Sequence, residues 1–312
     1  MSLFRTMALI DKITFGFSLP HRSPDPIDIA AVRRVAQRAE ELGFRDLWVT
    51  ENTLDHVFCL DSVVALTYAA AVTTKIRLGV SVMVLPLHHP IHVAHRIATL
   101  DYLSGGRAIL GAGLGRSSHY AEFQIPSERR VARFCESVEL IRRLWADSEV
   151  NYSGTIFQLT GAKLGVKPVQ RPGPPIWLGG THPDAIRRAA AIADGWMGAG
   201  GGSFEAFRRD IALMKEELER AGRDPASYPL SKRVFLSVHE HADVARAELE
   251  RWFMTVYRNT KGAAQSGFYG RPEEVRGKIE ELAETGVNHL ILNPVCRYTE
   301  QLEALAEALR IN

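Results

Sequence analysis

The hydrophobic pattern of the chain alternates between short strand-like runs and longer stretches of helical period. Ile13–Leu19 is the first strand-like run, and Asp28–Leu42 after it has apolar side chains at helical spacing until Gly43 ends it. The predicted strands are 13–19, 46–50, 76–84, 107–112, 176–179, 196–199, 234–238 and 287–292. The predicted helices are 28–42, 62–73, 90–103, 127–145 with Ser127 as its N-cap, 183–193, 204–221, 243–257, 272–285 and 299–309.

Eight strands, each followed by a helix, predict a (β/α)8 TIM barrel in this chain of 312 residues. A doubly wound sheet shows the same alternation and is the competing fold, but the number of units favours the barrel. Because no linker or low-complexity stretch divides the chain, we expect a single domain over 1–312. Residues 1–12 are expected to be a flexible start or residues added ahead of a natural start near Met7.

One segment interrupts the alternation between the fourth helix and the fifth strand. Residues 149–175 hold aromatic and apolar side chains among several glycines and prolines, which predicts a hairpin followed by an irregular connection. Such an insertion is either a functional rim over the barrel or a surface excursion, and the sequence does not choose between them.

Composition excludes several classes of protein. The net charge of +2, with basic and acidic residues interspersed, gives no nucleic-acid patch. Three distant cysteines, Cys59, Cys135 and Cys296, form neither a disulfide framework nor a metal motif, and they fit a reducing cytoplasm. There is no apolar run long enough to span a bilayer and no signal-peptide pattern at the start, so we expect no membrane association.

Catalytic groups of a TIM barrel lie at the carboxyl ends of its strands and in the loops that follow. Two of these loops are rich in glycine, Gly179-Gly180-Thr181 and Gly200-Gly201-Gly202-Ser203, and each precedes a predicted helix. Backbone N–H groups and the helix dipole make such turns suitable for a phosphate, although the glycines also fit plain tight turns.

Other motifs are weaker. Gly111-x-Gly113-x-Gly115 has the wrong spacing for a dinucleotide fingerprint. His88, His89, His92 and His95 lack the cysteine or acidic partners that would complete a metal site, so no metal is predicted. No nucleophile elbow is present, and Ser117-Ser118-His119 is too local to form a triad.

Five segments in order resemble the luciferase-like monooxygenase superfamily, and more narrowly its deazaflavin (coenzyme F420)-dependent oxidoreductase branch. They are ELGFRDLWVTEN, KIRLGVSVMVLPLHHP, TLDYLSGGRAILGAGLG, PVQRPGPPIWLGGTHPDAIRRAAAIADGWM and FYGRPEEVRGKIEELAETGVNHLIL. The resemblance covers about residues 13 to 310. It implies a barrel with an isoalloxazine-type ring over the strand ends.

The resemblance also implies which residues hold the cofactor. A bulge with a non-prolyl cis peptide in the third strand backs the ring in relatives, and the matching bond here is Ser81-Val82. The loops after the fifth and sixth strands hold the phosphate in relatives. The implied cofactor-binding residues are Ser81, Val82, Gly113, Leu114, Gly115, Gly179, Gly180, Thr181, Met197 and Gly198.

Two positions depart from the family pattern. Many relatives have an acidic residue and then His after the second strand, whereas this chain has Glu51-Asn52, whose amide cannot transfer protons near neutral pH. Sugar-phosphate dehydrogenase relatives have a catalytic Glu where this chain has Arg116, which binds an anionic ligand or forms a surface ion pair. Glu51, Asn52 and His119 are therefore the catalytic candidates, with His56, His88 and Arg116 as pocket residues; Glu51 is otherwise a buried, paired acid.

The sequence is compatible with three functions. The first is hydride transfer between F420 and a small organic substrate, with the protein orienting the reactants. The second is an FMN-dependent monooxygenase that uses reduced flavin and oxygen. The third is a non-catalytic member that binds flavin or another ligand. A homodimer is the assembly that relatives suggest.

Overall fold

A computed structural model describes residues 9–311 and confirms the predicted (β/α)8 barrel. Eight parallel strands form a ring in the order β1, β3, β5, β6, β9, β10, β11, β13, which closes because β13 pairs with β1. A doubly wound sheet would leave two open edges, so that alternative is excluded. The strands are β1 (Thr14–Ser18), β3 (Asp46–Val49), β5 (Arg77–Val84), β6 (Ala108–Gly113), β9 (Ile176–Gly179), β10 (Gly195–Gly198), β11 (Leu230–Val238) and β13 (His289–Pro294).

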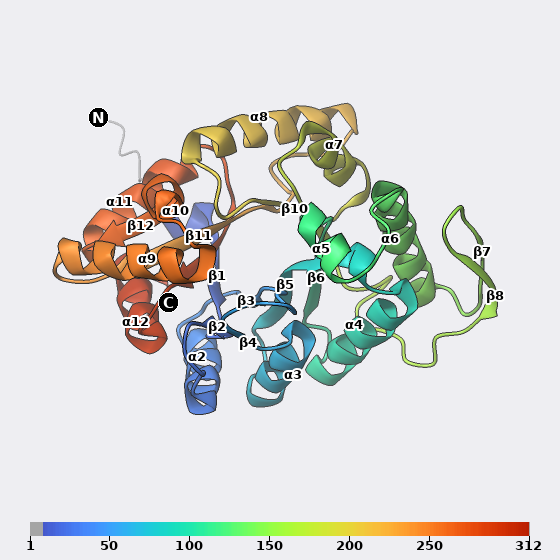
Figure 1. The fold of residues 1–312 in the computed structure, drawn as a ribbon, viewed down its shortest axis with the longest axis horizontal. Helices are drawn as coiled ribbons and strands as arrows, with labels where there is room; N and C mark the ends of the chain where they lie inside the picture. The colour runs from blue at the N-terminus through green and yellow to red at the C-terminus, as the bar shows by residue number, and fades with distance from the viewer. Residues whose placement is uncertain (1–8, 312) are drawn as a thin grey trace, which may run out of the picture.

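Helices surround the ring, with α2, α3 and α4 on one side and α7 and α8 on the opposite side (Figure 1). Their bounds follow the predicted ones closely, since the apolar positions at helical spacing face the barrel. They are α2 (Ile29–Glu41), α3 (Ser62–Val72), α4 (Pro90–Ser104), α6 (Arg130–Ala146), α7 (Pro183–Ile192), α8 (Phe204–Arg220), α9 (Ala242–Tyr257), α11 (Pro272–Ala283) and α12 (Tyr298–Leu309).

Three boundary predictions are wrong. Ser127 does not cap α6, because the chain first turns and passes through a left-handed residue, Arg129, before the helix starts. Strand β11 begins at Leu230 rather than at Val234 and therefore includes two basic residues. Of the expected flexible start, residues 9–12 form a short helix, α1 (Leu9–Lys12), with Leu9 buried, while residues 1–8 lie outside the described residues.

Several short helices and strands were not predicted from the sequence. They are β2 (Arg22–Ser23), β4 (Phe58–Cys59), the 3-10 helix η1 (Leu85–Leu87), α5 (Ser117–Glu122), α10 (Lys261–Ser266) and β12 (Gly267–Gly270). Strand β12 lies outside the ring. It pairs with the second half of β11, whose first half pairs with β10.

The interior of the barrel is filled by a small cluster of large side chains, one from each of five strands. Trp48 is central to it, and Gly79 makes room, since a Cβ there would lie 2.3 Å from the Trp48 ring. The other members are Ile109, Trp177, Met197 and Ile291, with Val82 packed on them. Because this plug is solid, a ligand has to bind at an end of the barrel.

The insertion at 149–175 forms the predicted hairpin, β7 (Val150–Ser153) paired with β8 (Gln158–Ala162). It lies at the periphery beyond α6 (Figure 1), where the Glu136 carboxylate of that helix accepts the N–H groups of Thr155, Ile156 and Phe157. No residue of the insertion lines the cavities at the barrel mouth described below, so the surface-excursion reading is favoured.

Within residues 9–311, no helix is both long and apolar enough to cross a membrane.

Candidate active site

Two adjoining cavities lie at the carboxyl ends of the strands. The first, the mouth cavity, has a volume of about 530 Å³ and opens over the plug of the barrel. The second, the outer cavity, has a volume of about 590 Å³ and shares Arg116 and Tyr257 with the first. Both volumes are in the range of small-molecule and cofactor sites.

One side of the mouth cavity consists of the two glycine-rich loops. Gly179, Gly180 and Thr181 lead into α7, and Gly198 to Gly201 lead into α8. Each helix has a capping side chain at its start, His182 on the N–H of Asp184 and Ser203 on the N–H of Ala206. The N-terminus of α7 therefore opens on the cavity, and the loop that leads into α8 lines it as far as Gly201, an arrangement suited to a phosphate.

The facing side of the mouth cavity is the bulge in β5. The peptide bond between Ser81 and Val82 is cis, and the register with β6 shifts between Val80 and Met83, as the resemblance implied. The Val82 side chain packs against two glycines, because a Cβ on Gly113 would lie 2.7 Å, and one on Gly179 3.0 Å, from its methyl groups. These glycines thus accommodate the bulge.

Glu51 stabilises the bulge and does not line either cavity. Its carboxylate accepts the Val84 N–H at 2.6 Å and contacts Nε2 of His88 at 2.6 Å. Both oxygens are therefore bound to the chain at the end of β5. This corrects the expectation that Glu51 and His88 face the ligand. The contacts of Glu51 agree instead with the alternative, that it is a paired acid within the barrel.

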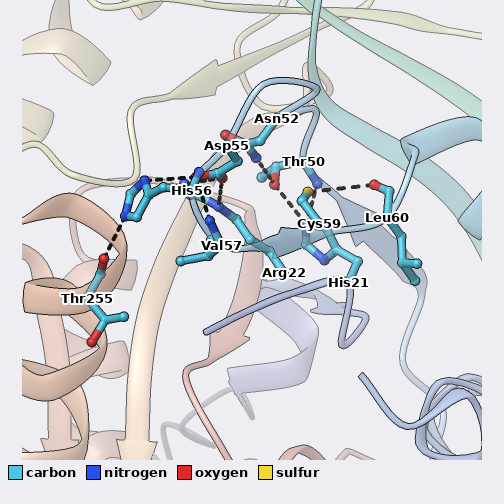
Figure 2. A network of polar contacts seen from close by, with 10 residues as sticks. All are labelled: His21, Arg22, Thr50, Asn52, Asp55, His56, Val57, Cys59, Leu60 and Thr255. Atoms are coloured by element: carbon cyan, nitrogen blue, oxygen red, sulfur yellow. Dashed lines mark hydrogen bonds and ion pairs between the residues drawn. The ribbon is translucent and has the colours of Figure 1, made fainter. Parts of the chain in front are cut away.

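The loop after β3 is fixed by a polar network, shown in Figure 2. The Asn52 amide donates to Thr50 Oγ1 at 2.7 Å, and Nε2 of His21 accepts the Thr50 N–H at 2.7 Å. Nδ1 of His21 donates to the Leu19 carbonyl at 2.7 Å. Burial lowers the pKa of His21 to about 3, and two nearby guanidinium groups act in the same direction, so its imidazole is neutral.

Further along the same loop, Asp55 forms an ion pair of 2.7 Å with Arg22 of β2, and both side chains are mostly buried. His56 bridges from this loop to α9, since its Nε2 lies 2.8 Å from the Thr255 carbonyl (Figure 2). The loop therefore forms a fixed wall of the outer cavity, to which Asn52 and His56 contribute.

The predicted residues divide into three groups. Most of the cofactor-binding set lines the mouth cavity: Ser81, Val82, Leu114, Gly115, Gly179, Gly180, Thr181, Met197 and Gly198. Gly113 lies beneath Val82 without lining it. Asn52, His56 and His119 line the outer cavity, and Arg116 lines both, while Glu51 and His88 line neither.

Sequence reasoning missed several residues of the mouth cavity, namely Thr50, Arg233, Phe235, Tyr257 and Ile291. Arg233 is the most informative. It follows Lys232 in a strand whose residues are all buried, whereas the predicted strand began only after this basic pair, at Val234. The available signal was the run Leu230–Val238, which contains strand-forming residues on both sides of the basic pair.

The buried Lys232 lies behind the second glycine loop. Its ammonium donates to the Ala199 carbonyl at 2.9 Å and lies 4.6 Å from the centre of the Phe207 ring. Burial lowers its pKa to about 8. Near neutral pH, a positive charge therefore stands beneath the loop that opens on the mouth cavity.

Comparison with known proteins gives the family. The model of the luciferase-like monooxygenase family matches residues 13–289, so the chain belongs to that family. It is 34% identical over 213 residues to a 5,10-methylenetetrahydromethanopterin reductase of Archaeoglobus fulgidus, a match that covers 67% of this chain and 60% of the relative.

Two further similarities bear on the site. An F420-dependent glucose-6-phosphate dehydrogenase of Kineococcus radiotolerans is 29% identical over 226 residues, covering 70% of this chain and 66% of the relative. The crystal structure of the monooxygenase RslO1 from Streptomyces bottropensis superposes with a TM-score of 0.82 and 24% identity, over 96% of this chain and 97% of that one. The curated relatives thus include an F420-dependent enzyme, whereas the likeness to RslO1 is one of fold. The chain matches less than two thirds of the length of these two curated relatives.

Proposed function

We propose that this chain binds coenzyme F420 in the mouth cavity and transfers a hydride between it and a small organic substrate in the outer cavity. The observation that carries the proposal is the junction of the two cavities at Arg116 and Tyr257. A ring in the first cavity and a substrate in the second would meet there. The cofactor supplies the hydride chemistry, and the protein orients both reactants.

The residues present fit a phosphate-bearing ring cofactor. Thr181 and the glycine loops at the starts of α7 and α8 would hold the phosphate, with the Lys232 charge behind them. Val82 and Met197 would give the ring an apolar bed. The F420-dependent relative supports the choice of F420.

Proton transfer falls to a residue of the outer cavity, because Glu51 is bound to Val84 and His88. We assign it to His119 at Nε2. The other ring nitrogen, Nδ1, lies 3.4 Å from the Arg116 N–H and accepts it, which leaves Nε2 free of that contact. Asn52 would bind the substrate through its amide.

The second candidate is an FMN-dependent monooxygenase, which the family description and the similarity to RslO1 favour. Titration of the purified protein with F420 and with FMN separates the two. We expect saturable binding of F420, with oxidation of its reduced form that depends on substrate and not on oxygen. Oxygen-dependent turnover of FMN alone would establish the second candidate, and failure to bind either cofactor would refute both.

A homodimer through α3 and α4 is the assembly we propose. Helix α3 is apolar on nearly all sides, yet Val64 is 68% exposed, and Tyr102 and Leu103 of α4 are 64% and 62% exposed. Exposed apolar side chains on these two neighbouring helices support an interface between two copies of the chain. Light scattering should give twice the chain mass, and Val64→Glu should give the monomer mass; a wild-type monomer would contradict the proposal.

A further inference from the structure

Arg233 crosses the barrel mouth. It leaves β11, and its Nη2 donates to the Ser81 carbonyl at 2.9 Å and to the Ser81 hydroxyl, on β5 at the opposite side of the ring of strands. The residue is only 8% exposed and lines the mouth cavity. Its guanidinium therefore lies between the plug of the barrel and any ligand above it.

No carboxylate of residues 9–311 forms an ion pair with Arg233. The groups whose charge acts on it are another arginine, Arg22, and two phenols, Tyr257 and Tyr298. Its neighbour His21 is neutral. Burial lowers the pKa of Arg233 to about 10, which still leaves it charged near neutral pH.

Arg107 provides the internal comparison. It is also 8% exposed, but all three of its guanidinium nitrogens donate to oxygens of Ser104, Thr73, Ile76 and Ala70. In Arg233 only Nη2 has a hydrogen-bond partner among the described residues. Its Nε and Nη1 have none, and neither atom is fully buried. Burying a cation whose N–H groups lack acceptors costs free energy, unless a ligand supplies those acceptors.

Several of the side chains that line the mouth cavity together with Arg233 are apolar. Ile291 lies beside Arg233 in the sheet and Phe235 is two residues further along β11, while Val82, Met197 and the two glycine loops also line the cavity. The acceptor that reaches Arg233 is therefore an edge of a ring system, presenting oxygen or nitrogen atoms that match a planar fork.

We infer that Arg233 binds the pyrimidine edge of the cofactor ring and is the counter-charge of its reduced form. Uptake of a hydride brings two electrons and one proton, so the ring gains one negative charge, which delocalises onto this edge. The buried guanidinium then binds the reduced ring more tightly than the oxidised ring, and it raises the tendency of the bound cofactor to accept a hydride. This inference rests on the proposed function, because it requires that ring in the mouth cavity.

The test is the affinity of wild-type protein, Arg233→Met and Arg233→Lys for the oxidised and reduced forms of F420 and of FMN. For Arg233→Met we expect the preference for the reduced form to fall at least tenfold, equivalent to about 30 mV in the midpoint potential of a two-electron couple. Arg233→Lys keeps the charge without the planar fork and should fall in between. Arg116→Met, at the rim, is the matched control and should weaken both forms equally.

The outcomes separate the two proposals. If wild-type protein binds neither cofactor, the proposed function fails and this inference with it. If wild-type protein binds a cofactor and Arg233→Met weakens both forms by the same factor, or neither form, only this inference is overturned. Arg233→Lys guards against misfolding of the methionine variant, and circular dichroism monitors the fold of each protein.

Discussion

The two ends of the barrel each bury an arginine, and the surroundings of the two differ. At the amino end, Arg107 is surrounded by oxygen acceptors, and Asp46, also fully buried there, contacts His289 at 3.0 Å. At the carboxyl end, Arg233 has a single partner residue. Arg107 is therefore satisfied by the protein itself and serves stability, whereas Arg233 at the carboxyl end has donors left for a ligand.

Replacing each arginine with methionine tests this contrast and should give the largest effect. Arg107→Met leaves several buried oxygens without donors, each costing about 1–3 kcal/mol, so unfolding should become easier by at least about 3 kcal/mol. Arg233→Met removes an uncompensated charge and should change the free energy of unfolding by less than about 1 kcal/mol, or increase it. Urea unfolding measures both values. Equal losses in the two variants would show that the ends do not differ in this way.

The pH dependence of stability gives a second test of the carboxyl end, because His21 is buried there beside Arg233. His21, at the mouth beside Arg233, has its pKa lowered to about 3 by burial and the nearby cations, whereas the unfolded chain takes up the proton near pH 6.5. The stability that depends on neutral His21 is complete above pH 6.5 and is lost as the pH falls toward 3. At pH 5 the loss is about 2 kcal/mol.

His21→Gln should therefore lose less stability than wild-type protein when urea unfolding is compared at pH 7.5 and pH 5. Carboxylates such as Asp46 lose stability in both proteins, so the difference between the two proteins isolates His21. Identical losses would mean that His21 is protonated in the native state or takes no part.

Two glycines, one in a loop of the mouth and one outside it, allow a matched pair of substitutions. Gly180 has a φ of +152°, and a Cβ there would lie 2.8 Å from the Ala185 side chain, whereas Gly165, which lines neither cavity, has no atom within 4 Å of a Cβ. Gly180→Ala should weaken cofactor binding about tenfold, or about 1.4 kcal/mol, by displacing the loop before α7. Gly165→Ala should change it little. A fluorescence titration decides, and equal affinities would remove the first loop from the site.

The smallest predicted effect concerns Lys232. Burial lowers its pKa to about 8, so its charge beneath Ala199 is present below pH 8 and lost as the pH rises through that value. Affinity for a phosphate-bearing cofactor should then fall a few-fold between pH 7 and pH 9. Lys232→Met should bind more weakly at pH 7 and show no such fall. A fall of the same size in the variant would assign the pH dependence to another group.

The sequence predicted the barrel because alternation between strand and helix period is a local property that every unit repeats. Short elements such as α5 and β12 were missed, since four to six residues carry too little periodicity to stand out. The insertion was recognised, but its place beyond α6 depends on Glu136, which contacts it only in the folded chain.

The candidate site was predicted where it depends on backbone shape. Gly179, Gly180 and the Ser81-Val82 bond could be read from spacing and resemblance, and the structure places them together. The direction in which a side chain points could not be predicted from spacing or resemblance. Glu51 turns toward Val84 instead of the cavity, and Arg233 spans the mouth, because both depend on partners from other strands.

The structure of the protein with F420 bound tests the central claim most directly. We predict the phosphate at the Gly179–Thr181 and Gly198–Gly201 loops, the ring against Val82, and an edge of the ring within hydrogen-bond distance of Arg233. A cofactor bound elsewhere, or a ring in the mouth cavity whose phosphate points away from both loops, would contradict it.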